Sequence, residues 1–484
     1  MAPTIVIFGA SGDLTSRKLI PAIYSLHQKK RLPPDTKVVG FARTRFTHDD
    51  WREQLAESTT RFAGAEFDGA AWSDLASRIF YSPGSVDRID DLQALCKLLE
   101  EIEGGGTSTR IYYLSMAPHF YEAAEANLGA ARMAGEGHGP RRIVVEKPFG
   151  TDLASAQQLN RKIHDVFAEN QVYRIDHYLG KETVQNVLVL RFANTIFEPV
   201  WNRNYVDHVE ITAAESLTVG HRAGYYDTAG VLRDMLQGHL LQLLTLTAME
   251  APVRFEAEAV RDEKVKVLRA VRPVQGEDVG ADTLRGQYLG YCEEPGVRPD
   301  SQTATFAAIK LRVDNWRWQG VPFYLRSGKA MSCATTQLVI QFRQPPYMLF
   351  GGGPRDSRDA NRLVVQIQPA EGIQVHFHTK VPDAGMRLRM TDLSFRFREK
   401  FAGPMPEAYQ RLLLDVINGD ASLFARSDEV ETAWSIVDPI QSAWDTGSQP
   451  QLLRYEPGMW GPVEATEWME RQGRSWFDTC PVLH

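Results

Sequence analysis

A short segment of the chain gathers side chains that bind anions and move protons. The run RIDHYLGKE (174–182) places Asp176, His177, Tyr178 and Lys181 within six positions, directly before a helical pattern of apolar residues. The ammonium, imidazole and phenol groups donate hydrogen bonds, and the start of the following helix adds N–H groups and a partial positive charge. The pattern favours a pocket for a phosphate group. A solvated loop without a specific role is the alternative.

A single histidine lies in the longest apolar helical pattern. In GVLRDMLQGHLLQLL (230–244), His239 has leucines seven and three positions before it and four after it, so α-helical spacing predicts a buried or cleft-lining side chain. With a carboxylate partner this imidazole would be a general base, and without one it is a core residue. Asp234 is about 140° away on an α-helical wheel, so we expect the partner elsewhere in the chain.

The run EKPFG (146–150) follows a predicted strand, at the edge where ligands bind in open α/β sheets. Lys147 at this position could contact both a sugar hydroxyl and a nicotinamide group. The Lys147–Pro148 bond is a candidate for the cis form, which an X-Pro bond tolerates. A lysine that merely ends a strand is the alternative.

A glycine-containing turn joins the first predicted strand, TIVIF, to a helical pattern. Glycines let the backbone approach a pyrophosphate, and the helix start behind them favours anions, so the turn indicates a dinucleotide site. The spacing is G-x-x-G rather than G-x-G-x-x-G, and Pro21 is expected to kink or restart the helix. An ordinary strand-to-helix turn is the alternative. The residues of the turn are Gly9, Ala10, Ser11, Gly12, Asp13 and Leu14.

The end of the second predicted strand indicates which dinucleotide is bound. An NAD site usually has an acidic residue there, whereas this chain has Arg43 and Arg45 in FARTRFT. A guanidinium forms charge-assisted bonds with a 2′-phosphate. We therefore expect NADP, with NAD as the weaker alternative.

The elements that must position these residues fall into two patterns. Up to residue 176, short apolar runs alternate with helical segments, which predicts a Rossmann-like, doubly wound parallel sheet. Residues 177–484 begin with long helices and continue with an array of strands, which predicts an α+β domain on a large, mostly antiparallel sheet. The fold class is thus α/β plus α+β, with domains 1–176 for coenzyme and 177–484 for substrate binding and dimerisation. The expected strands are TIVIF, KVVGFA, RIFY, RIYYLS, RIVVE, VYRID, FAAIKLRV, FYLRSGK, TQLVIQF, RLVVQIQ, IQVHFHT and LSFRF.

Composition excludes several other classes. The 54 Lys+Arg and 61 Asp+Glu residues give a net charge of −7, so there is no overall positive field for nucleic acid or an anionic membrane. Cys96, Cys292, Cys333 and Cys480 form no C-x-x-C pair, which argues against a disulfide framework or a zinc site and favours a reducing cytoplasm. The apolar segment 229–249 carries charged and polar residues, so we expect no membrane span.

Six blocks of sequence occur in order from about residue 4 to residue 465: IVIFGASGDLTSRKLIPAIYSL, IVVEKPFG, RIDHYLGKETVQNVLVLRFAN, GYYDTAGVLRDMLQGHLLQ, VPFYLRSGKAM and YEPGMWGP. Together they resemble the glucose-6-phosphate dehydrogenase family over nearly the whole chain. The resemblance implies oxidation of β-D-glucose 6-phosphate at C1 to 6-phospho-D-glucono-1,5-lactone, with hydride transfer to NADP. This is the first oxidative step of the pentose phosphate pathway.

The resemblance also implies a role for each candidate residue, and it implies no metal. His239 would be the general base, with Asp176 as the carboxylate that orients it and stabilises its charged form. The residues expected at the 6-phosphate are His177, Tyr178 and Lys181, and those at the sugar hydroxyls are Lys147, Glu215, Asp234, Lys329 and Gln368. The residues expected at the coenzyme are Gly9 to Leu14 at the pyrophosphate, Arg43 at the 2′-phosphate, Met116 and Pro118 near the nicotinamide ribose, and Lys147.

The chain departs from the family pattern at three positions. A second basic residue commonly follows the lysine of the R-S/T-G-K segment by five positions, and here that position is Ala334. The residue before the proposed base is Gly238 where the family tends to have Asn. These two changes leave the preference among hexoses open. Gln366 replaces a basic residue of a second, structural NADP site, which we expect to be absent.

Two other functions stay open on the sequence alone. One is an NAD(P)-dependent dehydrogenase of a different or unphosphorylated hexose, since E-K-P also ends strands in other sugar oxidoreductases. The other is a silent protein that keeps the fold and binds NADP without catalysis; the presence of both His239 and Asp176 disfavours it. One face of the predicted antiparallel sheet is free to pack on a second copy, so we expect a homodimer or homotetramer.

Overall fold

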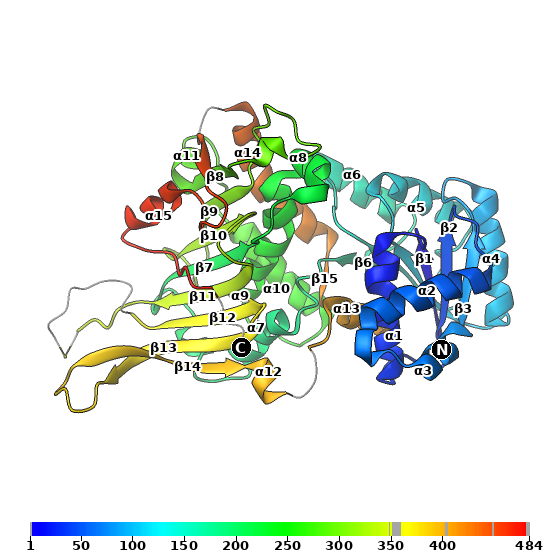
Figure 1. The fold of residues 1–484 in the computed structure, drawn as a ribbon, viewed down its shortest axis with the longest axis horizontal. Coiled ribbons are helices and arrows are strands. Elements are labelled where there is room, and N and C mark those ends of the chain that lie inside the picture. Colours follow the sequence, from blue (N-terminus) through cyan, green and yellow to red (C-terminus); the bar gives the residue numbers. More distant parts are fainter. Residues whose placement is uncertain (1, 348, 351–359, 402–404, 448–449, 481–484) are drawn as a thin grey trace. The chain divides into compact units, whose positions relative to one another are not determined.

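The first of two structural units is a twisted parallel sheet covered by helices on both sides (Figure 1). The computed structural model describes residues 2–347, 349–350, 360–401, 405–447 and 450–480. All neighbouring strands of the sheet run parallel except β15, which pairs antiparallel with β6. In sheet order the strands are β15 (Phe424–Ala425), β6 (Val172–Ile175), β5 (Arg141–Val145), β4 (Thr109–Leu114), β1 (Pro3–Phe8), β2 (Lys37–Ala42) and β3 (Ile79–Pro83).

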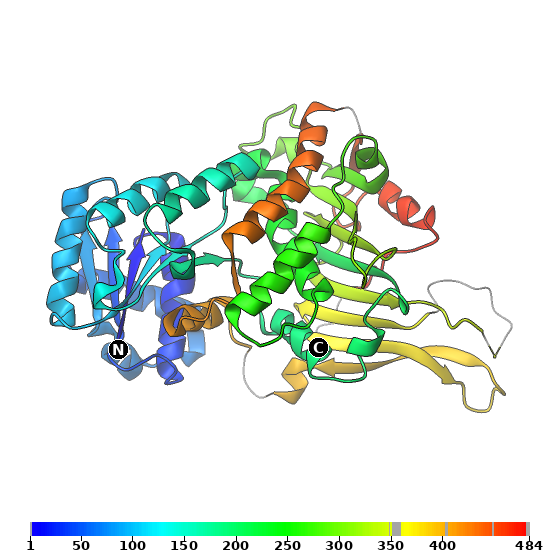
Figure 2. The ribbon, with the colours of Figure 1, turned by 180° about the vertical axis from the view of Figure 1, so that it is seen from behind.

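Fully buried apolar strands explain why this sheet is central. Every residue of β1 and β4 is buried, as expected for strands of a parallel sheet with helices on both faces. Figures 1 and 2 show α1, α2 and α3 on one side of the sheet and α4, α5 and α6 on the other. The predicted doubly wound sheet is confirmed. The helices of this unit are α1 (Ile20–Gln28), α2 (His48–Ala63), α3 (Gly69–Ala76), α4 (Ile89–Glu103), α5 (Tyr121–Ala130), α6 (Leu153–His164) and α13 (Ala408–Asn418).

The second unit is built on a larger sheet in which most pairs are antiparallel. Only β7–β10 and β8–β16 pair in parallel among its described strands. This confirms the predicted mostly antiparallel sheet, although β7, β8 and β16 were not among the expected strands. In sheet order the strands are β14 (Leu388–Arg396), β13 (Gly372–Lys380), β12 (Arg362–Gln368), β11 (Thr335–Phe342), β7 (Val206–Ala214), β10 (Pro322–Gly328), β9 (Phe306–Arg312), β8 (Thr283–Tyr288) and β16 (Leu452–Tyr455).

Helices of the second unit pack on the central strands of its sheet. A π-helix, η8, contacts β7 and β10, and α7 contacts β12 and α9. Among the described residues, no helix has the length and hydropathy of a membrane span. The remaining helices outside the first list are α7 (Glu182–Phe192), α8 (Ala223–Val231), η8 (Leu232–Leu240), α9 (Leu241–Ala248), α10 (Ala257–Ala270), α11 (Asp278–Asp282), α12 (Phe397–Lys400), α14 (Ser427–Thr446) and α15 (Val463–Glu470).

The two units are not contiguous in sequence. The first comprises residues 1–181, 253–261 and 406–431, and the second comprises 182–252, 262–405 and 432–484. The expected division into 1–176 and 177–484 therefore differs from the structure. The late segment joins the first unit because β15 extends its sheet and Arg142 donates to the carbonyl oxygens of Val416 and Ile417 at 2.6 and 2.7 Å.

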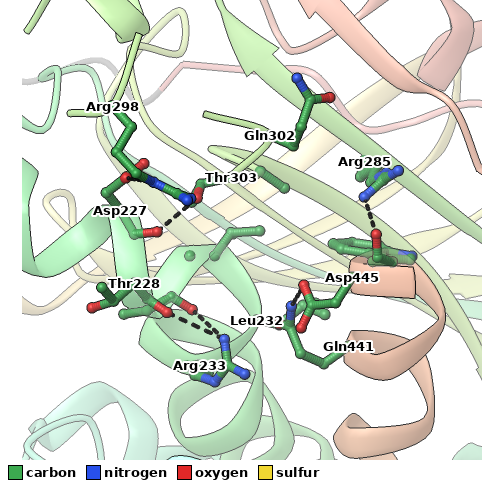
Figure 3. Close-up of a pocket in the computed structure, with 15 residues that line it drawn as sticks. Asp227, Thr228, Leu232, Arg233, Arg285, Arg298, Gln302, Thr303, Gln441 and Asp445 are labelled. Atoms are coloured by element: carbon green, nitrogen blue, oxygen red, sulfur yellow. Dashed lines mark hydrogen bonds and ion pairs between the residues drawn. The ribbon is translucent and has the colours of Figure 1, made fainter. Parts of the chain in front are cut away.

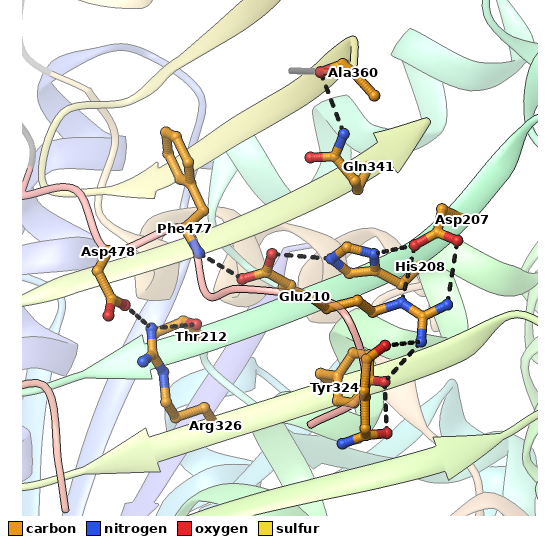
Figure 4. A network of polar contacts seen from close by, with 12 residues as sticks. Asp207, His208, Glu210, Thr212, Tyr324, Arg326, Gln341, Ala360, Phe477 and Asp478 are labelled. Atoms are coloured by element: carbon orange, nitrogen blue, oxygen red, sulfur yellow. Dashed lines mark hydrogen bonds and ion pairs between the residues drawn. The ribbon is translucent and has the colours of Figure 1, made fainter. Parts of the chain in front are cut away.

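The C-terminal segment, Arg474–Cys480, crosses one face of the second sheet (Figure 4). Asp478 accepts from the buried Arg326 of β10 at 2.6 Å. The backbone N–H of Phe477 donates to Glu210 of β7 at 2.9 Å, and its carbonyl accepts from Gln337 of β11 at 2.7 Å. Three strands are thus connected by one segment that lies more than a hundred residues further along the chain.

One disulfide closes the same region. Cys333 and Cys480 are bonded, with Cα atoms 6.0 Å apart and 147 positions between them in sequence. Spacing in the sequence, which argued against a disulfide framework, did not anticipate this bond, because only the return of the C-terminal segment brings the two residues together. Cys96 and Cys292 are free thiols.

A buried histidine in this unit lies between two carboxylates (Figure 4). His208 is 2% exposed, with its two ring nitrogens 2.8 Å from Asp207 and 3.2 Å from Glu210. Burial lowers the pKa of His208, but the hydrogen bonds and charges of the two carboxylates outweigh it, and the net pKa is raised above its ordinary value of 6.5. Arg474 also pairs with Asp207, at 2.9 Å.

We expect this site to stabilise the protein more at pH 6 than at pH 8. When the pKa of a histidine is higher in the folded than in the unfolded protein, its protonation stabilises the fold. This stabilisation is fully present below the pKa of the unfolded state and is lost as the pH rises through the pKa of the folded state. The difference in unfolding free energy between the unmutated protein and His208→Gln should therefore be smaller at pH 8 than at pH 6. Denaturant unfolding at both pH values measures it, with the exposed His221→Gln as control. A pH-independent difference would contradict this role.

Candidate active site

The glycine turn after β1 is held against two neighbouring strands. The N–H of Gly9 donates to Phe41 O of β2 at 2.9 Å, and Gly12 N–H donates back to Gly9 O at 2.9 Å. Gly9 has φ +79°, and a Cβ there would lie 2.2 Å from the carbonyl oxygen of Ser115, which follows β4. Both the backbone conformation and the close approach require glycine. The turn leaves an open cradle of backbone at the carboxyl edge of the sheet, which fits a pyrophosphate.

The helix behind the turn starts in two steps. A π-helical turn, η1 (Thr15–Leu19), comes first, and α1 begins at Ile20 with Pro21 in its first turn. The predicted restart at Pro21 is confirmed. Proline is tolerated there because it has no N–H to donate, and the π-helical turn before it pairs the N–H of Ile20 with Thr15 O, five residues back.

Arg43 lies at the end of β2, beside the glycine turn. Its guanidinium is 5.5 Å from the centre of the Phe120 ring, and the side chain is exposed. The next residue, Thr44, donates to the hydroxyl of Ser11 in the turn at 3.2 Å. An arginine in this position suits the 2′-phosphate of a dinucleotide held by the turn. Met116 and Pro118 follow the adjacent strand β4.

Lys147 follows β5, and its bond to Pro148 is cis, as the sequence predicted. Glu146 beside it accepts hydrogen bonds from Tyr113 at 2.5 Å and Tyr409 at 3.2 Å. Burial raises the pKa of Glu146 to about 7, with a smaller contribution from the charge of Asp176, while the two phenols oppose the shift. This carboxyl and both tyrosines were not predicted from the sequence. The only signal was the position of Glu146 at a strand end.

The predicted phosphate segment forms one tight turn after β6. Asp176 is 2% exposed, and its Oδ1 accepts from the N–H of Tyr178 at 3.0 Å. The ammonium of Lys181 lies 4.2 Å from the centre of the Tyr178 ring, and the rings of His177 and Tyr178 are 5.0 Å apart. The structure therefore brings His177, Tyr178 and Lys181 together, as expected. Gly180 is required here, since a Cβ would lie 2.7 Å from the Ala408 carbonyl oxygen of α13.

In the second unit, three of the predicted sugar-binding residues form one ionic cluster. Lys329 follows β10, and its ammonium pairs with Glu215 and lies 3.4 Å from Asp234. Arg222 is 3.4 Å from the same aspartate. The Lys329 side chain is only 9% exposed, so its charge is held by these carboxylates in a fixed position. Alternating cations and carboxylates of this kind can bind several hydroxyl groups of one sugar.

Hydrogen bonds of the Lys329 backbone hold the cluster in place. Lys329 N–H donates to Thr305 O at 2.9 Å, and its carbonyl accepts from the phenol of Tyr455 at 2.7 Å. The ring of Tyr226 lies 5.4 Å from the lysine ammonium. Tyr226 and Tyr455 were not predicted as parts of this site; Tyr226 comes from the neighbouring helix α8, and Tyr455 comes from β16, far along the chain. Gln368, expected in the same site, lies at the end of β12, next to the Ile367 carbonyl that accepts from Thr183 of α7 at 2.9 Å.

The helix that carries Asp234 and His239 is not an α-helix, which corrects the wheel argument. Gly230 has φ 65° and ψ 176°, so the helix is interrupted there, and Leu232–Leu240 is π-helical. Residues five apart are hydrogen-bonded neighbours in a π-helix, so the predicted separation of about 140° between Asp234 and His239 is wrong. His239 is 6% exposed, which confirms the predicted burial. A π-helical segment is frequent at functional sites.

A dinucleotide cradle on a doubly wound sheet, together with a second unit that presents a buried lysine–carboxylate cluster, defines the architecture of a nicotinamide-dependent oxidoreductase acting on polyhydroxylated substrates. Comparison with known proteins gives the family. The family model "Glucose-6-phosphate dehydrogenase, NAD binding domain" matches residues 6–186, and "Glucose-6-phosphate dehydrogenase, C-terminal domain" matches residues 188–477. The chain belongs to the glucose-6-phosphate dehydrogenase family, as the resemblance predicted.

Relatives match along their whole length. Glucose-6-phosphate 1-dehydrogenase of Aggregatibacter actinomycetemcomitans is 44% identical over 98% of this chain and 96% of its own. The enzyme of the same name from Rhizobium meliloti is 44% identical over 98% of this chain and 97% of its own. A solved glucose-6-phosphate dehydrogenase in complex with its substrate glucose 6-phosphate is 36% identical, covers 98% of both chains and has a TM-score of 0.91. The Mycobacterium avium enzyme structure is 34% identical, with coverage of 100% and 99% and a TM-score of 0.87.

Proposed function

We propose that the chain oxidises β-D-glucose 6-phosphate at C1 to 6-phospho-D-glucono-1,5-lactone with NADP as coenzyme. The observation that carries this conclusion is the match of both family models to a chain that retains the glycine turn, the phosphate segment and the Lys329 cluster. Formation of NADPH, followed at 340 nm with glucose 6-phosphate and with free glucose, tests it. A higher kcat/KM for free glucose would overturn the assignment of the phosphate segment.

The proposed roles follow from the chemistry of each side chain. His239 takes the proton of the C1 hydroxyl, and Asp176 orients the imidazole and stabilises its charged form. His177, Tyr178 and Lys181 bind the 6-phosphate as hydrogen-bond donors. When bound, NADP supplies the acceptor for the hydride that leaves C1. The residues that hold the sugar hydroxyls are Lys147, Glu215, Asp234, Lys329 and Gln368.

The coenzyme fits the residues of the first unit. The Gly9 turn provides a backbone surface that a Cβ would fill, and Arg43 lies at the strand end where the 2′-substituent of a dinucleotide is bound. Met116 and Pro118 follow β4, next to β1, and would contact the nicotinamide ribose. None of these coenzyme residues carries a charge that favours NAD over NADP, so NAD should be the coenzyme with the lower kcat/KM.

Replacing Arg43 by alanine should lower kcat/KM for NADP about tenfold or more and leave that for NAD within about threefold. The loss is one charge-assisted contact of about 1.5 to 3 kcal/mol with the 2′-phosphate, which NAD lacks. Steady-state kinetics with both coenzymes measure the ratio. Arg61→Ala is the control, since Arg61 is an exposed arginine in the last turn of α2, within the same unit, and has no proposed role at the coenzyme. An unchanged NADP/NAD ratio in Arg43→Ala would refute this role.

Lys181→Ala should raise KM for glucose 6-phosphate about tenfold or more, with kcat changed by a few-fold at most. The ammonium binds a part of the substrate that does not react, so its removal weakens ground state and transition state alike. The same variant should leave the slow oxidation of free glucose unchanged. Equal losses of kcat/KM with both sugars would mean that Lys181 supports the fold rather than binding the phosphate.

The preference among hexose phosphates is set partly by the two departures from the family pattern. Ala334 removes one expected cation from the phosphate site, and Gly238 leaves more space beside His239. A different or unphosphorylated hexose is therefore the second candidate substrate. kcat/KM for glucose 6-phosphate, galactose 6-phosphate and free glucose distinguishes these candidates.

We propose in addition a homodimer or homotetramer in the cytoplasm. The outer strands β13 and β14 are mostly half-buried or exposed, and Leu393 on β14 is 66% exposed, so this part of the sheet offers apolar surface to a second copy. Light scattering measures the oligomer. The cytoplasm is the compartment that supplies phosphorylated sugars and NADP together.

A further inference from the structure

A pocket of about 630 Å³ lies within the second unit (Figure 3), and the residues that line it do not include Lys329, Glu215 or Asp234. Its walls are the end of α8, the start of η8, strand β8, the segment 298–304 and the last turns of α14. The volume lies within the range of small-molecule sites, from about 300 to 1,000 Å³. None of the roles proposed above uses this space.

The pocket contains a buried cation without an ionic partner. Arg285 is 8% exposed; its Nε donates to Pro450 O at 2.8 Å and its Nη1 to Trp444 O at 2.6 Å. In the part of the chain that the structure describes, no carboxylate lies within 4.0 Å of this guanidinium. Burial lowers the pKa of Arg285, while the charge of Asp445 opposes the shift. A guanidinium has five N–H donors, so donors remain for a ligand after these two bonds.

Two further arginines line the same space. Arg298 pairs with Asp227 at 3.0 Å, and that carboxylate also accepts from Tyr291 at 3.2 Å and from Ser301. Asp227 is thus saturated with donors and holds Arg298 at the rim. Arg233 donates to carbonyl oxygens at the end of α8, as Figure 3 shows.

The backbone adds to this positive field. The kink at Gly230 separates the body of α8 from η8, and the buried residues Gly230, Val231 and Leu232 line the pocket, with the N–H of Val231 donating to Ala304 O at 3.1 Å. The first turn of a helix carries outward N–H groups and a partial positive charge. Three arginines and this helix start face two aspartates: Asp227, which is saturated, and Asp445, which accepts from Gln441 at 2.8 Å. The pocket therefore favours a ligand with net negative charge.

We propose that this pocket is a second anion site, which binds a small organic phosphate no larger than a mononucleotide. The phosphate would receive hydrogen bonds from Arg285, and the organic part would contact other residues that line the pocket, such as Gln302 and Gln441. The proposal does not depend on the reaction proposed above. Because Arg233 precedes Asp234 in the chain, an occupied pocket would also lie close to the residue that holds Lys329.

Isothermal titration with pyrophosphate as the probe tests the site in the full-length protein. We expect a class of sites with one pyrophosphate per chain that weakens about tenfold or more in Arg285→Gln and in Gln302→Glu. The second variant adds a carboxylate at an exposed lining position, so it keeps the test valid if Arg285→Gln does not fold. Arg471→Ala, at an exposed arginine directly after α15, is the matched control.

A crystal soaked in tungstate supplies the second measurement. An anomalous peak within hydrogen-bond distance of Arg285 supports the site. Equal pyrophosphate affinity in all four proteins, or tungstate density confined to other parts of the molecule, would overturn the proposal.

Discussion

Replacing His239 by asparagine should lower kcat by about 10²- to 10⁴-fold and leave KM for glucose 6-phosphate within a few-fold. Asparagine keeps a polar group of similar size in this buried position but cannot accept the proton of the C1 hydroxyl. The loss should therefore fall on the chemical step and not on binding. Steady-state kinetics, with sugar binding measured separately by titration, separate the two effects.

The pH profile distinguishes a base from a structural residue. In the unmutated enzyme kcat should fall toward acidic pH as the imidazole is protonated, whereas the residual activity of His239→Asn should lose that limb. His208→Gln is the matched control: it removes a buried histidine from the same unit, and it should change stability while keeping kcat. A His239→Asn enzyme within tenfold of the original kcat would exclude His239 as the base.

Asp176→Asn should lower kcat, but by less than His239→Asn does. The carboxylate does not touch the substrate in this mechanism; it holds the imidazole in the productive tautomer and stabilises its charge, so the neutral amide weakens catalysis without abolishing it. If the two residues act as one unit, the double variant should be little worse than His239→Asn alone.

Local patterns in the sequence predicted the first unit well. The strand KVVGFA was placed where β2 lies, and TIVIF and VYRID fall within one residue of β1 and β6. Strands that are buried on both faces are continuous apolar runs, so length and bounding turns are enough to find them. Strand β7 was missed because its run, VDHVEITAA, mixes charged and apolar residues, although nearly all of it is buried.

The features that escaped prediction depend on distant parts of the chain. The charged residues of β7 are satisfied by Arg474 and Phe477 of the C-terminal segment, more than 260 positions away. The Cys333–Cys480 bond has the same origin. No local pattern signals such pairs.

The candidate site also combines features that are local in sequence with features that depend on distant segments. His177, Tyr178 and Lys181 come from one turn, so their proximity followed from spacing alone. The cluster of Lys329, Glu215 and Asp234 joins three elements and was implied only by the family resemblance. The π-helix was not predicted, because apolar spacing over nine residues does not separate i+4 from i+5 hydrogen bonding.

Replacing Gly9 by alanine should destabilise the first unit by about 3 kcal/mol or more and lower its Tm by about 6 °C or more. The new Cβ would lie 2.2 Å from the carbonyl oxygen of Ser115, and the backbone at φ +79° is unfavourable for a residue with a side chain. Relief requires the turn to move away from β4. The same movement distorts the cradle, so KM for NADP should rise in whatever fraction remains folded. Calorimetry and coenzyme kinetics measure the two effects.

Gly69→Ala is the control that separates the loss of a glycine from the loss of this geometry. Gly69 starts α3, and a Cβ there would have no heavy atom within 4 Å, so alanine should be neutral or slightly stabilising. The Tm of Gly12→Ala should lie between those of the other two variants. Its Cβ would lie 3.0 Å from the Gly9 carbonyl oxygen, but the backbone conformation at Gly12 is one that alanine can adopt. If Gly9→Ala matched Gly69→Ala in Tm and in KM for NADP, the turn would be an ordinary loop and the coenzyme would have to be held by other groups.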